Sequence, residues 1–227
     1  MRIVLFGATG MIGAGALLEC LDDPEVDSVI TIGRSATGVD HPKVTEIVHT
    51  DFYDYAAIRG RVVGCDGCLF CLGVSSAGMS EEAYHSLTYD LTLAAAEAVV
   101  AGAPQSTFCY VSGAGTDSSE TGRAMWARVK GKTENALLRL PFKAAYMLRP
   151  GYVQPMRGVR SKTRLYQAAY VVTRPLFPVL RRLIPGHVTT TVAMGRAMIE
   201  LVAHGDERRI LTTSDINRVA ERRSRAS

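Results

Sequence analysis

The fold of this chain can be read from residues 2–13, which are RIVLFGATGMIG. The apolar run Arg2–Phe6 predicts a buried strand, and the glycines after it predict a tight turn into a helix. In such a unit Gly7 permits the turn, Gly10 lets the backbone approach a phosphate, and Gly13 lets the helix press on the strand. Because free N–H groups at a helix start attract anions, we expect a dinucleotide here; the alternative is a glycine-rich turn without a ligand. The residues expected at the pyrophosphate are Gly7, Thr9, Gly10, Met11, Ile12 and Gly13.

The second expected strand, Ser28–Ile32, ends in Gly33-Arg34-Ser35. An enzyme specific for NAD usually carries Asp or Glu at this point, where the carboxylate accepts hydrogen bonds from the ribose hydroxyls. A carboxylate would repel a 2′-phosphate, whereas Arg34 would attract it and Ser35 would add a hydrogen bond. The sequence therefore predicts NADP(H) as the cofactor, and the alternative for Arg34 is a solvent-facing strand end.

Two later strand ends add candidate cofactor contacts. Asp51 and Phe52 follow the strand expected at Val44–Val48, where a carboxylate can lie beside the adenine. The carboxylate of Asp51 would equally serve as a cap for the next helical turn, and the residues leave both interpretations open. Leu72 and Gly73 end the strand expected at 67–72, at the crevice where the ligand should run.

Strands and helices alternate as far as residue 150, and the strands are nearly continuous apolar runs. This pattern predicts an α/β fold, a doubly wound parallel sheet covered on both faces. After Pro150-Gly151 the chain becomes rich in proline and arginine. We expect a small helical substrate lobe at residues 152–212, then a frayed, solvated basic tail at 213–227, all within one domain. The expected helices are Met11–Leu21, a turn at Asp54–Arg59, Ser80–Ala101, Arg123–Leu140 and Val192–Ala203, and the other strands are Thr107–Val111 and Ala144–Leu148.

Composition limits the classes of function. The chain has 227 residues, 47% of them hydrophobic and 21% charged, with a formal net charge of +4, which suits one globular core. Basic residues form no stripe interleaved with aromatics, so we expect no nucleic-acid partner. No signal peptide, no long uncharged apolar run and no disulfide pattern among five cysteines is visible, so we expect a cytoplasmic protein.

Cys65, Cys68 and Cys71 have a spacing that resembles a metal site. However, the segment around the last two reads as a buried strand, in which residues three apart point to opposite faces. Cys68 and Cys71 would then be unable to bind one ion. We therefore expect no metal site and interpret these cysteines as small apolar residues of the sheet.

Several short motifs resemble, in their order, those of the short-chain dehydrogenase/reductase superfamily and its atypical branch near the epimerase/dehydratase-like proteins. The resemblance implies an NAD(P)-binding Rossmann fold and a catalytic group of Ser, Tyr and Lys, with Tyr and Lys four residues apart on one helix face. Ser112 and Lys130 match this group, whereas Trp126 occupies the position of the Tyr. The motifs are the glycine turn, Gly33-Arg34, Asp51-Phe52, Cys71-Leu72-Gly73, Val111-Ser112-Gly113-Ala114, Val129-Lys130-Gly131-Lys132-Thr133-Glu134 and Leu148-Arg149-Pro150-Gly151. Pro150-Gly151 resembles the turn beside the nicotinamide.

Trp126 leaves the cofactor-binding motifs intact but removes the usual proton donor, because an indole N–H donates a hydrogen bond but does not shuttle a proton near neutral pH. Its ring is either a core aromatic or a wall beside the nicotinamide. A different acid would have to serve, and the candidates are Ser112, His85 and Tyr152. In relatives a polar residue near Thr88 and Asp90 supports the Lys, and an ordinary helix surface is the alternative here.

Three functions are consistent with this pattern. The first is an NADP-dependent oxidoreductase acting on a small carbonyl or alcohol with Ser112 and Lys130. The second is a non-catalytic NADP(H) sensor or scaffold. The third is a peripheral membrane protein that uses the arginine-rich segment Leu165–Ile184, for which a cover over the substrate pocket is the favoured interpretation. By analogy with relatives, a homodimer would pack through the Ser80–Ala101 and Arg123–Leu140 helices.

Overall fold

The computed structural model describes residues 1–159, 177 and 182–226. Its centre is a seven-stranded sheet of order β3-β2-β1-β4-β5-β6-β9, and every neighbouring pair is parallel. The order reverses between β1 and β4, which creates a crevice at the carboxyl ends of these strands. The strands are β1 (Arg2–Phe6), β2 (Ser28–Gly33), β3 (Val44–Val48), β4 (Gly67–Phe70), β5 (Thr107–Val111), β6 (Ala144–Arg149) and β9 (Ile210–Thr212). The expected doubly wound Rossmann fold is confirmed.

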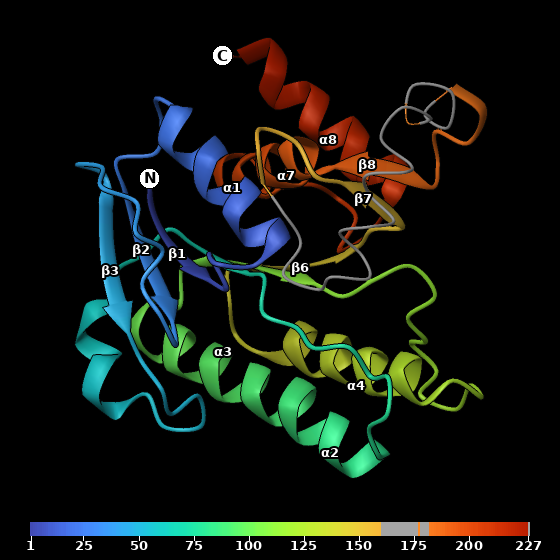
Figure 1. Cartoon of the computed structure of the whole chain (residues 1–227). Coiled ribbons are helices and arrows are strands. Elements are labelled where there is room, and N and C mark those ends of the chain that lie inside the picture. Colours follow the sequence, from blue (N-terminus) through green and yellow to red (C-terminus); the bar gives the residue numbers. More distant parts are fainter. Residues whose placement is uncertain (160–176, 178–181, 227) are drawn as a thin grey trace.

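Helices cover both faces of the sheet (Figure 1). One face carries α1 (Met11–Asp22), α7 (Thr191–Ala203) and α8 (Thr213–Ala226). The other carries α2 (Glu81–His85), α3 (Leu91–Gly102) and α4 (Met125–Arg139). A π-helical turn, Ser86–Asp90, joins α2 to α3, so the long helix expected from Ser80 is present with one wide turn inside it. Ser80 caps it as expected, because its hydroxyl accepts a hydrogen bond from the N–H of Ala83 (3.2 Å).

Alternation along the strands builds two cores. In β1, Ile3 and Leu5 pack toward α1 and α7, whereas Val4 and Phe6 pack toward α3. Cys68 belongs to the core on the α3 side and Cys71 packs against the other core. The expectation that these two cysteines face opposite ways is therefore confirmed. Within residues 1–159 and 182–226, no group of three His, Cys, Asp or Glu side chains is placed to hold a metal ion.

The C-terminal region departs from the sequence-based expectation. Residues 152–212 contain the small parallel pair β7 (Tyr152–Gln154) and β8 (Val188–Thr190), then α7, and end in β9, which joins the main sheet. The expectation of a frayed tail after residue 212 is wrong, because residues 213–226 form α8. The apolar side chains of Ile216 and Val219 are fully buried against the core, and this spacing on one helix face is what holds the segment down.

Arg223 is the residue that fixes α8 in place. Its side chain is only 2% exposed and pairs with Asp23, the residue that ends α1 (Nε to Oδ2, 2.7 Å). Most of the segment Leu165–Ile184, which was assigned either to a pocket cover or to a membrane surface, lies outside the described residues. Among the helices of the described ranges, none has the length and apolar character needed to cross a bilayer.

Candidate cofactor site

The glycine turn has the geometry that its sequence predicts. Gly7 has a φ of +78°, a conformation that side chains disfavour, and its carbonyl accepts a hydrogen bond from the N–H of Gly10 (2.9 Å). A β-carbon at Gly13 would lie 2.2 Å from the carbonyl oxygen of Gly7, so only glycine lets α1 start this close to the turn. No side chain caps the start of α1 and its first turn holds no acidic residue. The N–H groups there are thus available to an anion.

A pocket of about 480 Å³ opens at the carboxyl ends of the strands, beside this turn. Nine of the residues expected at the cofactor lie on its wall: Gly7, Thr9, Arg34, Ser35, Asp51, Phe52, Leu72, Gly73 and Lys130. Gly10, Met11, Ile12 and Gly13 form the turn and the first residues of α1. Ser112, Trp126, Pro150 and Gly151 are not among the residues that line this pocket. The fold therefore gathers the residues from β1, β2 and β4, and leaves part of the predicted catalytic group off the wall.

Arg34 projects from the end of β2 at one side of the pocket. Its side chain is exposed, and within the described part of the chain it forms no hydrogen bond or ion pair. Ser35 lies beside it and is also exposed. A cation without a partner at this position is free to bind an anionic group of a ligand.

Asp51 has the capping role, and its place beside an adenine stays a prediction. Its Oδ1 accepts hydrogen bonds from the N–H groups of Tyr53 (3.0 Å) and Asp54 (3.3 Å), which is the capping role. The same residue is exposed and lines the pocket, so it is accessible to a ligand there. Phe52 is buried beneath it, 6% exposed, with its ring 6.3 Å from that of Tyr55.

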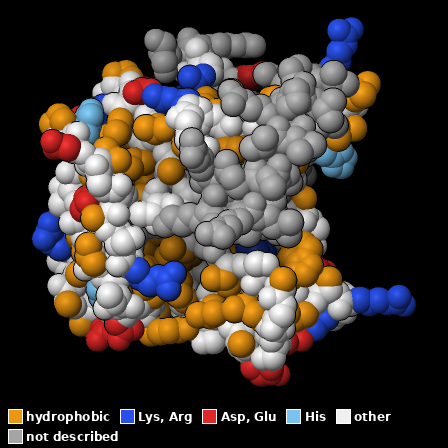
Figure 2. Space-filling view, viewed as in Figure 1, with side chains coloured by type: hydrophobic (Ala, Val, Ile, Leu, Met, Phe, Trp, Pro, Cys, Tyr) orange, Lys and Arg blue, Asp and Glu red, His pale blue; other side chains and the backbone are white. Residues whose placement is uncertain are grey.

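One wall of the pocket was not expected from the sequence, apart from Thr88 as a support for the Lys. Leu87 and Thr88 come from the π-helical turn, and Leu91 and Thr92 from the start of α3. The hydroxyl group of Tyr53 lies 3.0 Å from Oγ of Ser86, which ties the loop after β3 to this turn. Turns of this type are frequent at functional sites, but the sequence reads as an uninterrupted helix and gave no sign of it. Figure 2 shows apolar side chains gathered on this face of the molecule over α2 and α3.

Lys130 reaches the pocket from the middle of α4. Its Nζ donates a hydrogen bond to the carbonyl oxygen of Ser112 (2.9 Å) and lies 5.5 Å from the centre of the Tyr110 ring. Burial lowers the pKa of the ammonium group from 10.5 to about 8, although the charge of Glu134 acts in the opposite direction. Lys130 is thus a cationic group close to its titration point in a partly enclosed site.

The hydroxyl group of Ser112 is engaged away from the pocket. Its Oγ lies 2.5 Å from Oε1 of Glu134 and 3.0 Å from the carbonyl oxygen of Leu148. Glu134 is fully buried and its carboxylate binds the guanidinium of Arg149 through both oxygens. Glu134 and Arg149 belong to two of the motifs that carry the resemblance, but neither was expected as a site residue. The sequence did contain one sign of this role, because Glu134 is a carboxylate one helical turn after Lys130 and on the same helix face.

The remaining candidates lie around this centre. Trp126 is partly buried, and a β-carbon at Gly115 would lie 3.3 Å from its ring, so the indole covers the turn after β5 and belongs to neither core. The carbonyl of Pro150 accepts a hydrogen bond from Ala114, and Gly151 donates to Oγ1 of Thr213 (2.9 Å).

Two of the alternative acids point elsewhere. His85 contacts Lys132 (Nε2 to Nζ, 3.1 Å) and Asp90 (Nδ1 to Oδ2, 3.6 Å) on the surface between α2 and α4. The hydroxyl of Tyr152 donates to Gln154 (2.7 Å). Of the two residues considered as supports for the Lys, Thr88 faces the pocket and Asp90 faces His85.

No family model matches the chain. It is 30% identical over 176 residues to the mitochondrial protein fmp52-1 of Aspergillus terreus, an alignment that covers 74% of this chain and 72% of the relative. The chain belongs to the Fmp52 family. It is also 29% identical over 156 residues to the mitochondrial FMP52 of Meyerozyma guilliermondii, covering 66% of this chain and less than two thirds (64%) of that protein.

Solved structures confirm the fold. The Bordetella bronchiseptica enzyme WbmF in complex with NAD⁺ matches with a TM-score of 0.66 and 13% identity, covering all of this chain and 79% of WbmF. A short-chain dehydrogenase/reductase of Saccharomyces cerevisiae matches with a TM-score of 0.66 and 13% identity, covering 97% of this chain and 98% of that one. These two likenesses confirm the Rossmann fold that the resemblance implied.

The relatives overturn one expectation. The absence of a recognisable targeting pattern favoured the cytoplasm, but the Fmp52 proteins of Meyerozyma guilliermondii, Emericella nidulans and several Aspergillus species are named as mitochondrial. The expectation of a cytoplasmic protein is therefore wrong. The expectation rested on the absence of a secretory signal and of a disulfide pattern, and these absences do not distinguish the cytoplasm from the mitochondrion.

Proposed function

We propose that this protein is an oxidoreductase that binds NADP(H) in the pocket beside the glycine turn and acts on a small carbonyl or alcohol. The observation that carries the proposal is the pairing of two cations along one pocket: Arg34, without a partner among the described residues, and Lys130, beside the end of β5. Gly7 and Thr9 of the glycine turn also line the pocket, and β1 lies in the sheet between β2, which precedes Arg34, and β5, near which Lys130 lies. This is the order of groups that a phosphorylated dinucleotide requires.

The residues fit the cofactor part by part. The N–H groups at the start of α1 would hold the pyrophosphate, and Arg34 with Ser35 would hold the 2′-phosphate. Tyr53, Val74 and Leu87 are 51%, 41% and 37% exposed on the pocket rim, and an adenine would cover such apolar surface. Lys130 would bind the nicotinamide ribose. When bound, NADP(H) supplies or accepts the hydride.

Lys130 is also the best candidate to replace the missing tyrosine as proton donor. Among the described residues of the wall, the hydroxyl of Tyr53 is held by Ser86, Oδ1 of Asp51 caps the next turn, and the ring of Tyr110 is buried beneath the ammonium group. A pKa near 8 suits a general acid that works close to neutral pH. In this proposal Nζ of Lys130 gives a proton to the carbonyl oxygen of the substrate.

Calorimetric titration with NADPH and NADH tests the binding part. We expect clear preference for NADPH, and equal affinities would reject it. A panel of aldehydes and ketones followed by NADPH absorbance tests the chemistry, with wild type, Trp126→Tyr and Trp126→Phe compared. A tyrosine at this position would add a second proton donor beside Lys130, so the Tyr variant should be faster than wild type, whereas the Phe variant should not be.

A non-catalytic NADP(H) sensor or scaffold is the second candidate. It is favoured by the hydroxyl of Ser112, which is bound to Glu134 and not presented to the pocket. This function predicts tight NADPH binding by wild type and Trp126→Tyr without turnover of any carbonyl in the panel. The names of the relatives make the mitochondrion the first compartment in which to test either function.

A further inference from the structure

A second cavity, of about 800 Å³, lies at the opposite end of the sheet from the cofactor pocket. Thr107 and Ala144, the first residues of β5 and β6, line it, so it opens at the amino ends of the strands. The end of α7 and one face of α8 complete its wall. Five cationic side chains face it, namely Lys143, Arg208, Arg209, Arg218 and Arg222, against the acidic Asp206 and Glu207. Three of these cations have carboxylate partners, because Arg208 pairs with Asp215 and both Arg218 and Arg222 pair with Asp206. Glu200 also lies 3.7 Å from Arg222, so the positive charge without an acidic partner among the described residues comes from Lys143 and Arg209.

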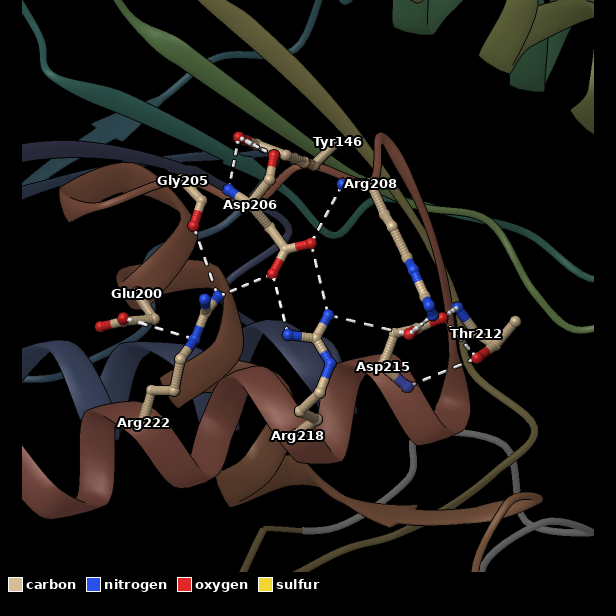
Figure 3. Close-up of polar contacts among 9 residues, drawn as sticks. All are labelled: Tyr146, Glu200, Gly205, Asp206, Arg208, Thr212, Asp215, Arg218 and Arg222. Atoms are coloured by element: carbon tan, nitrogen blue, oxygen red, sulfur yellow. Dashed lines mark hydrogen bonds and ion pairs between the residues drawn. The ribbon is translucent and has the colours of Figure 1, made fainter.

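Buried carboxylates set the positions of the arginines on α8 (Figure 3). The side chain of Asp206 is 5% exposed and accepts from Nη1 of Arg218 (3.1 Å) and Nη2 of Arg222 (2.9 Å). Arg222 also donates to the carbonyl oxygen of Gly205 (3.4 Å) and so covers the negative end of α7. A guanidinium carries five N–H donors, and these contacts leave part of each fork available. The arginines are thus held in fixed orientations before any ligand arrives.

Two further cations have no acidic partner in the part of the chain that the structure describes. Lys143 precedes β6, and Arg209 precedes β9. The guanidinium of Arg209 lies 4.8 Å from the centre of the Tyr146 ring. That ring is fixed, because the Tyr146 hydroxyl accepts from the N–H of Asp206 (2.8 Å) and donates to its carbonyl oxygen (3.1 Å). Unpaired like charges that face one cavity favour binding of a counter-charge.

We propose that this cavity binds the phosphate group of a small molecule. Arginine forks with a neighbouring lysine are the side chains that bind phosphate most effectively in proteins. The concave wall favours a small molecule over a nucleic acid or a membrane, which require an extended basic surface. Inorganic phosphate and a phosphomonoester carry the same group, and the experiment below separates them from a lipid headgroup.

The test is an NMR titration of the isotope-labelled full chain with inorganic phosphate and then with glycerol phosphate, at constant ionic strength. We expect saturable shifts of the backbone amides of residues 204–209. The double variant Lys143→Gln/Arg209→Gln should bind at least about tenfold more weakly. The matched control is Arg59→Gln/Arg123→Gln, which removes the same charge from two exposed side chains outside the cavity and should bind as wild type. If the double variant does not fold, the single variant Arg209→Gln takes its place and should also bind phosphate more weakly than wild type.

Three results would overturn the proposal. One is the absence of saturable shifts at residues 204–209, including the case in which only Gly7–Gly13 respond. Another is equal weakening in the control pair, which would mean a general charge effect. The last combines two observations: the wild-type protein floats with anionic phosphatidylserine vesicles but Lys143→Gln/Arg209→Gln does not, and free phosphate esters cause no shift. That result would mean that the surface binds lipid.

Discussion

Nζ of Lys130 lies 2.9 Å from the carbonyl oxygen of Ser112, so the middle of α4 is fixed to the residue that follows β5. This contact places a cation at the carboxyl edge of the sheet without using the hydroxyl of Ser112. The hydroxyl is instead bound to Glu134, one helical turn further along α4. The two residues that match the expected catalytic group are therefore joined through the backbone, and their side chains have different partners.

Lys130→Met should change how stability depends on pH. Burial lowers the pKa of Lys130 from 10.5 to about 8. Between these values the unfolded chain keeps the proton that the folded chain has lost, so wild-type stability should gain with rising pH across this window. At pH 7 we expect the Met variant to resist urea at least as well as wild type, with this advantage shrinking between pH 8 and pH 10.5. A difference that stays constant over the window would contradict the burial of a charged Lys130.

Arg34→Gln should lower the affinity for NADPH by about ten- to a hundredfold and leave NADH binding unchanged, because a charged hydrogen bond to phosphate contributes roughly 1.5–3 kcal/mol. Calorimetry with both nucleotides measures this difference. Arg34→Lys keeps the positive charge but lacks the paired N–H donors of a guanidinium, so its affinity for NADPH should lie between those of wild type and Arg34→Gln. Loss of NADH affinity by the same factor would mean that Arg34 acts on the fold and not on the phosphate.

Gly13→Ala should abolish dinucleotide binding and destabilise the protein by about 1–3 kcal/mol, because the new methyl group meets the carbonyl of Gly7 at 2.2 Å. Gly60→Ala is the matched control, since a β-carbon there meets nothing within 4 Å. Denaturant unfolding and an NADPH titration compare the two variants. Equal behaviour would show that the close approach at Gly13 has no consequence.

Glu134→Ala should destabilise the fold by about 3–5 kcal/mol, because it leaves Arg149, 19% exposed, without the fully buried carboxylate that neutralises it. The double variant Glu134→Leu/Arg149→Met removes both charges and should lose less than the single one. Urea unfolding of the three proteins measures the order. If the double variant had a lower free energy of unfolding than Glu134→Ala, the attraction within the ion pair would exceed the cost of burying its two charges.

Arg223→Ala should detach α8 and cost about 3–5 kcal/mol, because the Arg223 and Asp23 side chains are 2% and 6% exposed. Burial acts to raise the pKa of Asp23, but hydrogen bonds from Arg223 and Glu25 lower it overall. Stability from this pair should therefore be present at neutral pH and decline as the solution is acidified below the ordinary Asp pKa of 3.8. Proteolysis of the tail and acid unfolding test this, with Glu221→Ala, an exposed residue of the same helix, as control. Identical protection of residues 213–226 in both variants would contradict the anchoring role.

Local patterns were sufficient for most of the sheet and part of the site. The expected strands at Arg2–Phe6, Val44–Val48 and Thr107–Val111 coincide with β1, β3 and β5. The pattern failed at residues 213–226, where the arginines suggested a solvated tail. The apolar residues Ile216, Val219 and Ala220 at helical spacing were the signal for α8, but a stripe this narrow gains stability only when a surface exists for it to cover.

The sequence by itself determined the glycine turn, the Rossmann sheet and the absence of a Tyr four residues before Lys130, because each depends on residues close together in the chain. Tertiary structure alone decided the groups whose members are far apart. Asp23 and Arg223 are 200 positions apart, and the basic cavity combines the starts of β5 and β6 with α7 and α8. Ion pairs and cavities of this kind depend on how complete helices and strands pack against one another. Periodicity along the chain reports on local structure and does not show which distant residues come into contact. The cofactor site shows the same division. Residues 2–13 predicted a site for a dinucleotide, and only the fold showed which of the expected residues share its pocket.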